Sequence, residues 1–127
     1  MSASLAVQRL VAQALVDLPG VTGIFDGPPP DAAPPYLVIG SDTVSDAGTK
    51  TEVAHDHRIA INIWDAGPGA AAAKAMMGAV TDRLARLDGS SGGHLIISTR
   101  LLRSLVLTDA DGWTQGIVEF LVRSQAI

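Results

Sequence analysis

Isoleucines occupy alternate positions near the middle of the chain, at Ile59, Ile61 and Ile63. They belong to a run, residues 52–65, whose other register carries polar residues such as Arg58 and Asn62. Successive side chains of a β-strand point to opposite faces, so this pattern predicts a long strand with one buried face. A sheet face of this kind is stable only when another layer covers it.

Three further strands complete two predicted hairpins. Residues 36–43 precede the isoleucine strand, and residues 45–49 supply turn chemistry between them. Residues 95–108 and 113–124 form the second hairpin, with the sequence Asp-Ala-Asp-Gly at 109–112 as a tight turn. The chain therefore contains enough strand for an antiparallel sheet.

Two amphipathic segments predict helices. The first begins at Ser4 as its cap and ends near Asp17, and the second begins at Asp65 and ends near Leu87. Between the predicted elements lie an extended piece at 23–26, a proline-rich exposed connector at 27–35 and a flexible glycine-rich loop at 89–93. The fold predicted is α+β, a single domain over residues 1–127. We expect a two-layer sandwich, in the order α-β-β-α-β-β, with two long antiparallel hairpins packed on two helices.

Composition and charge exclude several classes of protein. The chain has 127 residues, no cysteine and a formal net charge of −4. Missing cysteine excludes disulfides and thiolate chemistry and fits a cytoplasmic protein. The negative balance argues against a protein that reads nucleic-acid sequence, which should be basic. The sequence contains no run of about 18 consecutive apolar residues, so it predicts no membrane-spanning segment.

Residues with catalytic potential do not form a recognisable active site. His55 and His57 point the same way in a strand, as two ligands of one metal would, and His94 is the remaining histidine. The favoured interpretation places His55 and His57 at the solvent-exposed end of a hairpin, and a metal-binding enzyme remains the alternative. The sequence has no nucleophile elbow and no phosphate-binding loop. We therefore expect no catalysis, no cofactor and no metal.

Trp64 and Trp113 are candidates for a subunit interface. Trp64 lies on the strand face opposite the isoleucines, and Trp113 directly follows the second hairpin turn. Tryptophan is enriched at the centres of protein interfaces, because a large rigid ring buries much surface at little entropic cost. Core packing is the alternative role for either ring.

The order of these segments resembles a known family. The segments are Val-Thr-Gly-Ile-Phe-Asp at 21–26, Pro-Tyr-Leu-Val-Ile-Gly at 35–40, the strand at 57–64 ending in Trp64, a small-residue helix and the closing hairpin. This sequence is similar to the tail terminator family of phages and gene transfer agents, also called tail-completion or tail-to-head joining proteins. The resemblance covers nearly the whole chain.

The resemblance implies a non-catalytic structural protein of a virion or phage-like tail, assembled in the bacterial cytoplasm. It implies a homo-oligomeric, hexameric ring that caps the tail tube, joins it to head-completion or connector proteins, and lets DNA pass without sequence-specific binding. Another neck or minor tail protein is the alternative. We also expect the loop at residues 41–50 to contact the tube or a neighbouring ring. Its polar candidates are Asp42, Ser45, Asp46, Thr49 and Lys50.

Overall fold

A computed structural model describes residues 1–27 and 31–127 of the chain. Within this part there are two helices and six strands. In chain order they are α1 (Ala3–Leu15), β1 (Ile24–Phe25), β2 (Tyr36–Asp46), β3 (Ala54–Asp65), α2 (Ala71–Ala85), β4 (Ser90–Ser91), β5 (His94–Thr108) and β6 (Thr114–Ala126). The predicted α+β class is confirmed. The predicted order α-β-β-α-β-β omits the two short strands β1 and β4, which the structure contains.

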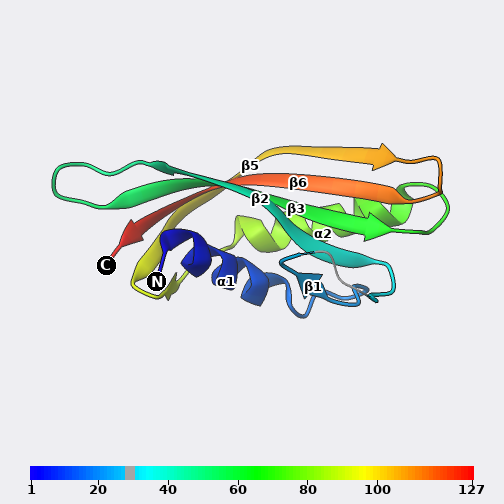
Figure 1. Ribbon diagram of the computed structural model, residues 1–127, viewed down its shortest axis with the longest axis horizontal. Helices are drawn as coiled ribbons and strands as arrows, with labels where there is room; N and C mark the ends of the chain where they lie inside the picture. The colour runs from blue at the N-terminus through cyan, green and yellow to red at the C-terminus, as the bar shows by residue number, and fades with distance from the viewer. Residues whose placement is uncertain (28–30) are drawn as a thin grey trace.

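The strands form one twisted sheet in the order β1-β2-β3-β6-β5-β4 (Figure 1). The two long hairpins meet where β3 pairs with β6, antiparallel from Ala54 opposite Gln125 to Asp65 opposite Thr114. The sheet is mixed and not wholly antiparallel, because β1 runs parallel to β2. The extended piece predicted at 23–26 contains β1, which pairs with Leu37 and Val38 of β2.

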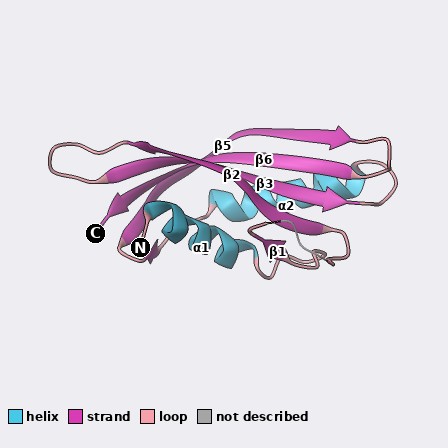
Figure 2. Cartoon of the chain, viewed as in Figure 1, coloured by secondary structure: helices cyan, strands magenta, loops and turns pink. Residues whose placement is uncertain are grey.

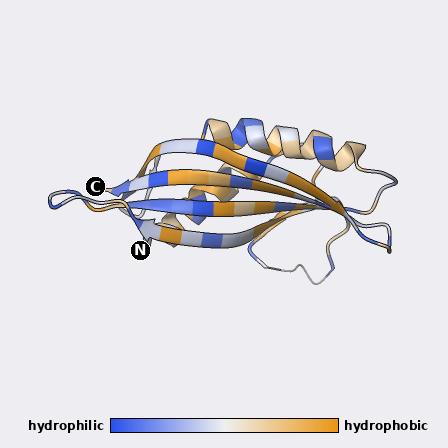
Figure 3. Cartoon of the chain, turned by 90° about the horizontal axis from the view of Figure 1, so that it is seen from above, coloured by the Kyte–Doolittle hydropathy of each residue, from blue (hydrophilic) through white to orange (hydrophobic). Residues whose placement is uncertain are grey.

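Both helices lie on one side of this sheet (Figure 2). Ile59, Ile61 and Ile63 are buried on that side, as their alternation predicts. Val118 and Phe120 of β6 face the same way and are also buried. Figure 3 shows hydrophilic and hydrophobic residues alternating along the strands. None of the described elements covers the opposite side, which we call the bare face.

The helix boundaries differ from the predicted ones. The hydroxyl of Ser2, and not of Ser4, caps α1 by accepting a hydrogen bond from the backbone N–H of Leu5. The Ser4 hydroxyl instead donates to Asp42 of β2. Asp65 ends β3 and is buried, so it does not cap α2, which begins later without a side-chain cap. Neither helix, within the described residues, is long and apolar enough to cross a membrane.

The glycine-rich stretch at 89–93 is ordered, which corrects the prediction of a flexible loop. Ser90 and Ser91 pair with the start of β5 as strand β4. The backbone N–H of Ile96 also donates to the carbonyl of Gly89, whose φ of +93° suits glycine. Of the predicted proline-rich connector, Pro28, Pro29 and Pro30 lie outside the described residues.

The first hairpin reaches well beyond the helices as an arm (Figure 1). Strand β2 continues to Asp46, further than predicted, and the connection to β3 occupies residues 47–53. Thr49 donates its backbone N–H to the carbonyl of Glu52, so the tip itself is a tight turn. The opposite end of the sheet carries the second hairpin turn, where Gly112 has a φ of +86° as the Asp-Gly pattern predicts.

Candidate functional site

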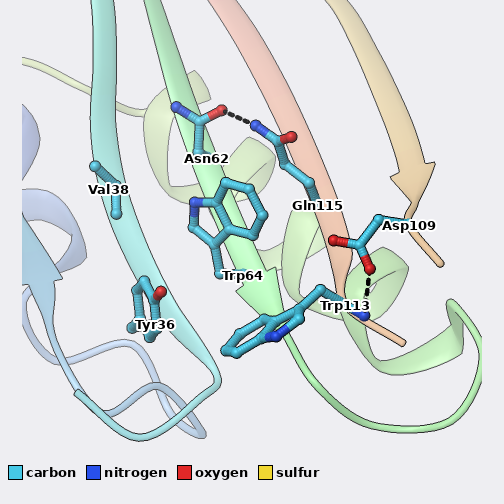
Figure 4. Close-up of a pocket in the computed structure, with 7 residues that line it drawn as sticks. All are labelled: Tyr36, Val38, Asn62, Trp64, Asp109, Trp113 and Gln115. Atoms are coloured by element: carbon cyan, nitrogen blue, oxygen red, sulfur yellow. Dashed lines mark hydrogen bonds between the residues drawn. The ribbon is translucent and has the colours of Figure 1, made fainter. Parts of the chain in front are cut away.

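Three aromatic side chains gather on the bare face at the end of the sheet away from the arm (Figure 4). Tyr36 begins β2 and lies opposite Trp64 near the end of β3. The ring of Trp113 meets both, with centroids 6.3 Å from Trp64 and 6.5 Å from Tyr36 in edge-to-face arrangements. Such geometry is favoured by the quadrupoles of aromatic rings. The structure therefore brings the two predicted tryptophans together and adds Tyr36.

The turn before β6 holds Trp113 in place. One carboxylate oxygen of Asp109 accepts hydrogen bonds from the backbone N–H groups of Asp111 and Trp113, both at 3.0 Å. The backbone N–H of Asp109 donates to the carbonyl of Trp113 at 3.0 Å. This closed turn projects the indole from the end of the sheet, so little entropy remains to be lost if a partner covers it.

A shallow pocket of about 450 Å³ opens among these rings. Its lining residues are Tyr36, Val38, Asn62, Trp64, Asp109, Trp113 and Gln115. Gln115 donates its side-chain N–H to the Asn62 oxygen at 3.0 Å, which fixes the polar wall (Figure 4). Both tryptophans remain half-buried. The hollow is apolar, has a few fixed polar groups and opens on the bare face. These features are typical of sites that bind a partner.

The predicted contact loop is divided by the structure. Asp42, Ser45 and Asp46 belong to strand β2, and only Thr49 and Lys50 lie at the arm tip. Asp42 is also turned toward α1, because the pairing of β2 with β3 shifts between Ile39 and Asp42. The prediction of one polar loop at 41–50 is therefore wrong in its boundaries. The exposed tip is the connection at 47–53.

The histidines form a row on the helix side of the sheet. His57 is fully buried, and its Nε2 lies 2.8 Å from the Ser124 hydroxyl. The His55 ring lies between His57 and His94, at centroid distances of 6.2 and 6.5 Å. The predicted solvent-exposed position is therefore wrong for His57, which shares the buried face of Ile59. Across residues 1–27 and 31–127, no group of three or more His, Cys, Asp or Glu side chains could hold a metal ion.

Comparisons with known proteins show which family this chain belongs to. The family model described as tail completion protein gp17 matches residues 2–125. The chain belongs to that tail completion family. It also resembles a chain in the solved virion of a native gene transfer agent particle, with a TM-score of 0.87, 26% identity and 98% of each chain covered. No match was found among curated proteins.

Membership of the tail completion family confirms the predicted resemblance and makes the protein a structural component of a phage-type tail. The family match does not assign a role to individual residues. Tyr36, Asn62 and Gln115 were missed as members of the site. The alternation around Leu37 could have placed Tyr36 on the bare face, whereas the register that brings it beside Trp64 is a tertiary property.

Burial of His57 predicts a pH-dependent stability. Burial lowers the pKa of His57, with opposing influence from Asp42 and Asp56 and further lowering from His55 and His94. Below about pH 6.5 the unfolded chain takes up a proton at this position that the folded chain resists, so stability falls as pH falls. His57→Asn should flatten the pH dependence of the unfolding free energy between about pH 7.5 and 5.5, by at most about 1.4 kcal/mol per pH unit.

Urea denaturation at several pH values measures this slope for both proteins. His57→Asn can lower stability at every pH, because the contact with Ser124 changes, so the comparison is between slopes and not absolute values. An unchanged slope in the variant would show that His57 does not supply the acid sensitivity.

Proposed function

We propose that the protein is a tail terminator, acting through one domain over residues 1–127. About six copies form a closed ring on the last ring of the tail tube, stop its growth and offer a docking face to head-completion or connector proteins. DNA passes through the lumen without sequence-specific binding. The role is structural and non-catalytic, and assembly takes place in the bacterial cytoplasm.

The observation that carries this proposal is the likeness to a chain of a gene transfer agent virion, over 98% of both chains. Together with the tail completion family match, it supports a position at an end of the tail. A protein placed there must bind copies of itself and two different neighbours along the tail axis. These contacts require separate surfaces on one small domain.

Two free strand edges support ring closure. Strand β2 has no outer partner along residues 39–46, and β5 has none along residues 97–108, among the residues described. The edge strand β5 carries four exposed hydrophobic residues: Ile97, Leu101, Leu105 and Leu107. Natural proteins usually protect such edges, because an unpaired apolar strand invites association. Different edges on opposite sides of one sheet suit a heterologous contact that closes into a ring.

The two ends of the sheet supply further contact surfaces, one of which adds to the subunit interface. We assign Trp64 and Trp113 to the subunit interface and the arm, with Thr49 and Lys50 at its tip, to the tube or a neighbouring ring. Asp42, Ser45 and Asp46 support the arm from within β2. Another neck or minor tail role is the alternative, and crosslinking to tube or connector proteins would separate the two. An enzyme using His55 and His57 is disfavoured, because the Nε2 of His57 is engaged with Ser124.

The tryptophan assignment predicts a defect in assembly without a defect in folding. Trp113→Ala should keep a near-native far-UV circular dichroism spectrum and weaken each interface by about 2 kcal/mol or more, because it removes a central aromatic anchor. Light scattering after size exclusion should then show a shift from rings to monomers. Val16→Ala is the control, since Val16 is also an exposed apolar residue but lies at the end of α1.

Loss of rings in both variants would remove the specific role of Trp113. Unfolding of Trp113→Ala at a temperature where the wild-type monomer is stable would identify Trp113 as a core residue. The subunit interface would then lie elsewhere. Trp113→Phe, which keeps an aromatic edge, should retain part of the assembly.

The arm predicts a separate defect. Replacing residues 48–53 by Asn-Gly should close a short hairpin after Ala47, because Ala47 already donates to the Ala54 carbonyl. The replacement removes Val53, whose carbonyl accepts a hydrogen bond from the backbone N–H of Ala126. That N–H must find a new acceptor, so a small loss of stability is expected. The shortened protein should form rings yet fail to bind tube ends in a pull-down with assembled tubes. Normal binding would reduce the arm to a connector.

A further inference from the structure

Four arginines converge on the middle of the bare face. Arg58 of β3 and Arg100 of β5 both lie level with Leu121 of β6. Arg103 and Arg123 occupy the adjacent levels of β5 and β6. The side chains of Arg58, Arg103 and Arg123 are 61%, 65% and 50% exposed, so they reach solvent beyond their local contacts. We call these four residues the arginine group.

Two carboxylates accompany the arginine group and hold it in place. Arg123 makes a two-point contact with Asp56, at 2.9 and 3.1 Å. Arg103 donates to Glu119 at 2.7 Å, and Arg58 lies 4.0 Å from the same carboxylate. No acidic partner is found for Arg100 among the described residues.

The charge at the arginine group is opposite in sign to that of the whole molecule. Four arginines and two carboxylates leave a net charge of +2 on the facing parts of β3, β5 and β6. The chain as a whole carries −4, so its other charged groups together carry −6. Composition alone hides this separation. A sheet surface with excess arginine next to an otherwise acidic molecule attracts a polyanion to that surface specifically.

Arginine suits phosphate, because its planar guanidinium presents several donors and stays charged at all relevant pH values. Adjacent strands lie about 4.8 Å apart, so Arg58 and Arg100, two strands apart, are separated by about 10 Å. The group thus spans a broad surface, and an open hollow of about 440 Å³ lies beside Arg58 and Asp56. Arginines spread over an open sheet face fit contacts to the phosphates of a nucleic-acid backbone, and such contacts carry no sequence information.

We propose that the arginine group on the bare face contacts the phosphate backbone of duplex DNA as it passes the protein. The choice of DNA as ligand rests on the proposed function. The contact is weak, because Asp56 and Glu119 offset half of the positive charge. It guides the polyanion without stopping its movement.

Fluorescence anisotropy with a short labelled duplex, titrated between about 50 and 200 mM salt, tests this contact. Wild-type protein should bind weakly, independently of sequence, and with a clear salt dependence. The variant R58Q/R100Q removes the two arginines with the weakest local pairing and leaves the close pairs of Arg103 and Arg123 intact. Its salt slope should fall by about 2, because each arginine that no longer neutralises a phosphate lowers the slope by about one unit.

The control K74Q/R86Q removes the same number of charges on the helix side, from exposed Lys74 of α2 and exposed Arg86 directly after it. This control should retain the wild-type salt slope. The net charge changes equally in the two double variants, and only the side of the sheet that loses the charges differs. Equal reductions in both variants, or no salt-dependent binding by wild type, would overturn the proposal. Loss of ring assembly in R58Q/R100Q with unchanged DNA binding would also overturn it, since the face would then belong to a protein contact.

Capping of tail tubes is measured separately in the same preparations. Tube capping by a wild-type protein that shows no DNA binding would reject the arginine contact and leave the terminator function standing. DNA binding by a protein that never caps tubes would reject the terminator function and leave the charge-specific contact standing.

Discussion

The register between β3 and β6 determines what each side of the molecule presents. Ile61 lies opposite Val118 and Ile59 opposite Phe120, and all four side chains are buried under the helices. If β3 slipped by one residue against β6, Ile59 and Ile61 would turn away from the helices and Arg58 would enter the core. Burial of several aliphatic side chains, each contributing roughly 1.5–3 kcal/mol, therefore holds the register. The same register places Trp64 beside Gln115 and Arg123 beside Asp56 on the bare face.

Because both helices occupy one side, the other side of the sheet is left for interactions. Aromatic side chains collect at one end of that face, and arginines collect at its middle. The arm extends from the opposite end, and unpaired edges flank the sheet. A single α+β unit thus offers several distinct surfaces at once. A tail protein that meets its own copies and other components along one axis requires this kind of division.

Periodic residues made much of the fold predictable. The alternation of Ile59, Ile61 and Ile63 identified β3 and its buried face, and the Asp-Gly turn located the second hairpin. Strands β1 and β4 contain only two residues each, which is too short for any period to be visible. Strand β4 pairs with the start of β5 across Gly92 and Gly93, a local hairpin that the glycine pattern could have indicated. Strand β1 depends on the edge of β2, with which it pairs in parallel, and no period or turn signal reveals that contact. The α+β class could therefore be derived, while the mixed sheet could not.

The candidate sites were predictable to a smaller extent. His57 continues the alternation of Ile59, so its burial was available from the pattern, but its polar character led to an exposed assignment. Asp42 faces α1 because of the shift after Ile39, which no local sequence signal reveals. The aromatic cluster and the arginine group each join residues from separate strands. Their components were visible in the sequence, whereas their proximity depends on strand order and register.

The most direct measurement of the central claim is electron microscopy of tail tubes assembled with and without this protein. If the protein is a tail terminator, a ring of about six copies should sit at one end of each tube, and further tube protein should not add there. The bare face and arm should be identifiable when the present fold is fitted to that ring. Protein distributed along the tube wall, or tubes that keep growing past the bound protein, would contradict the account.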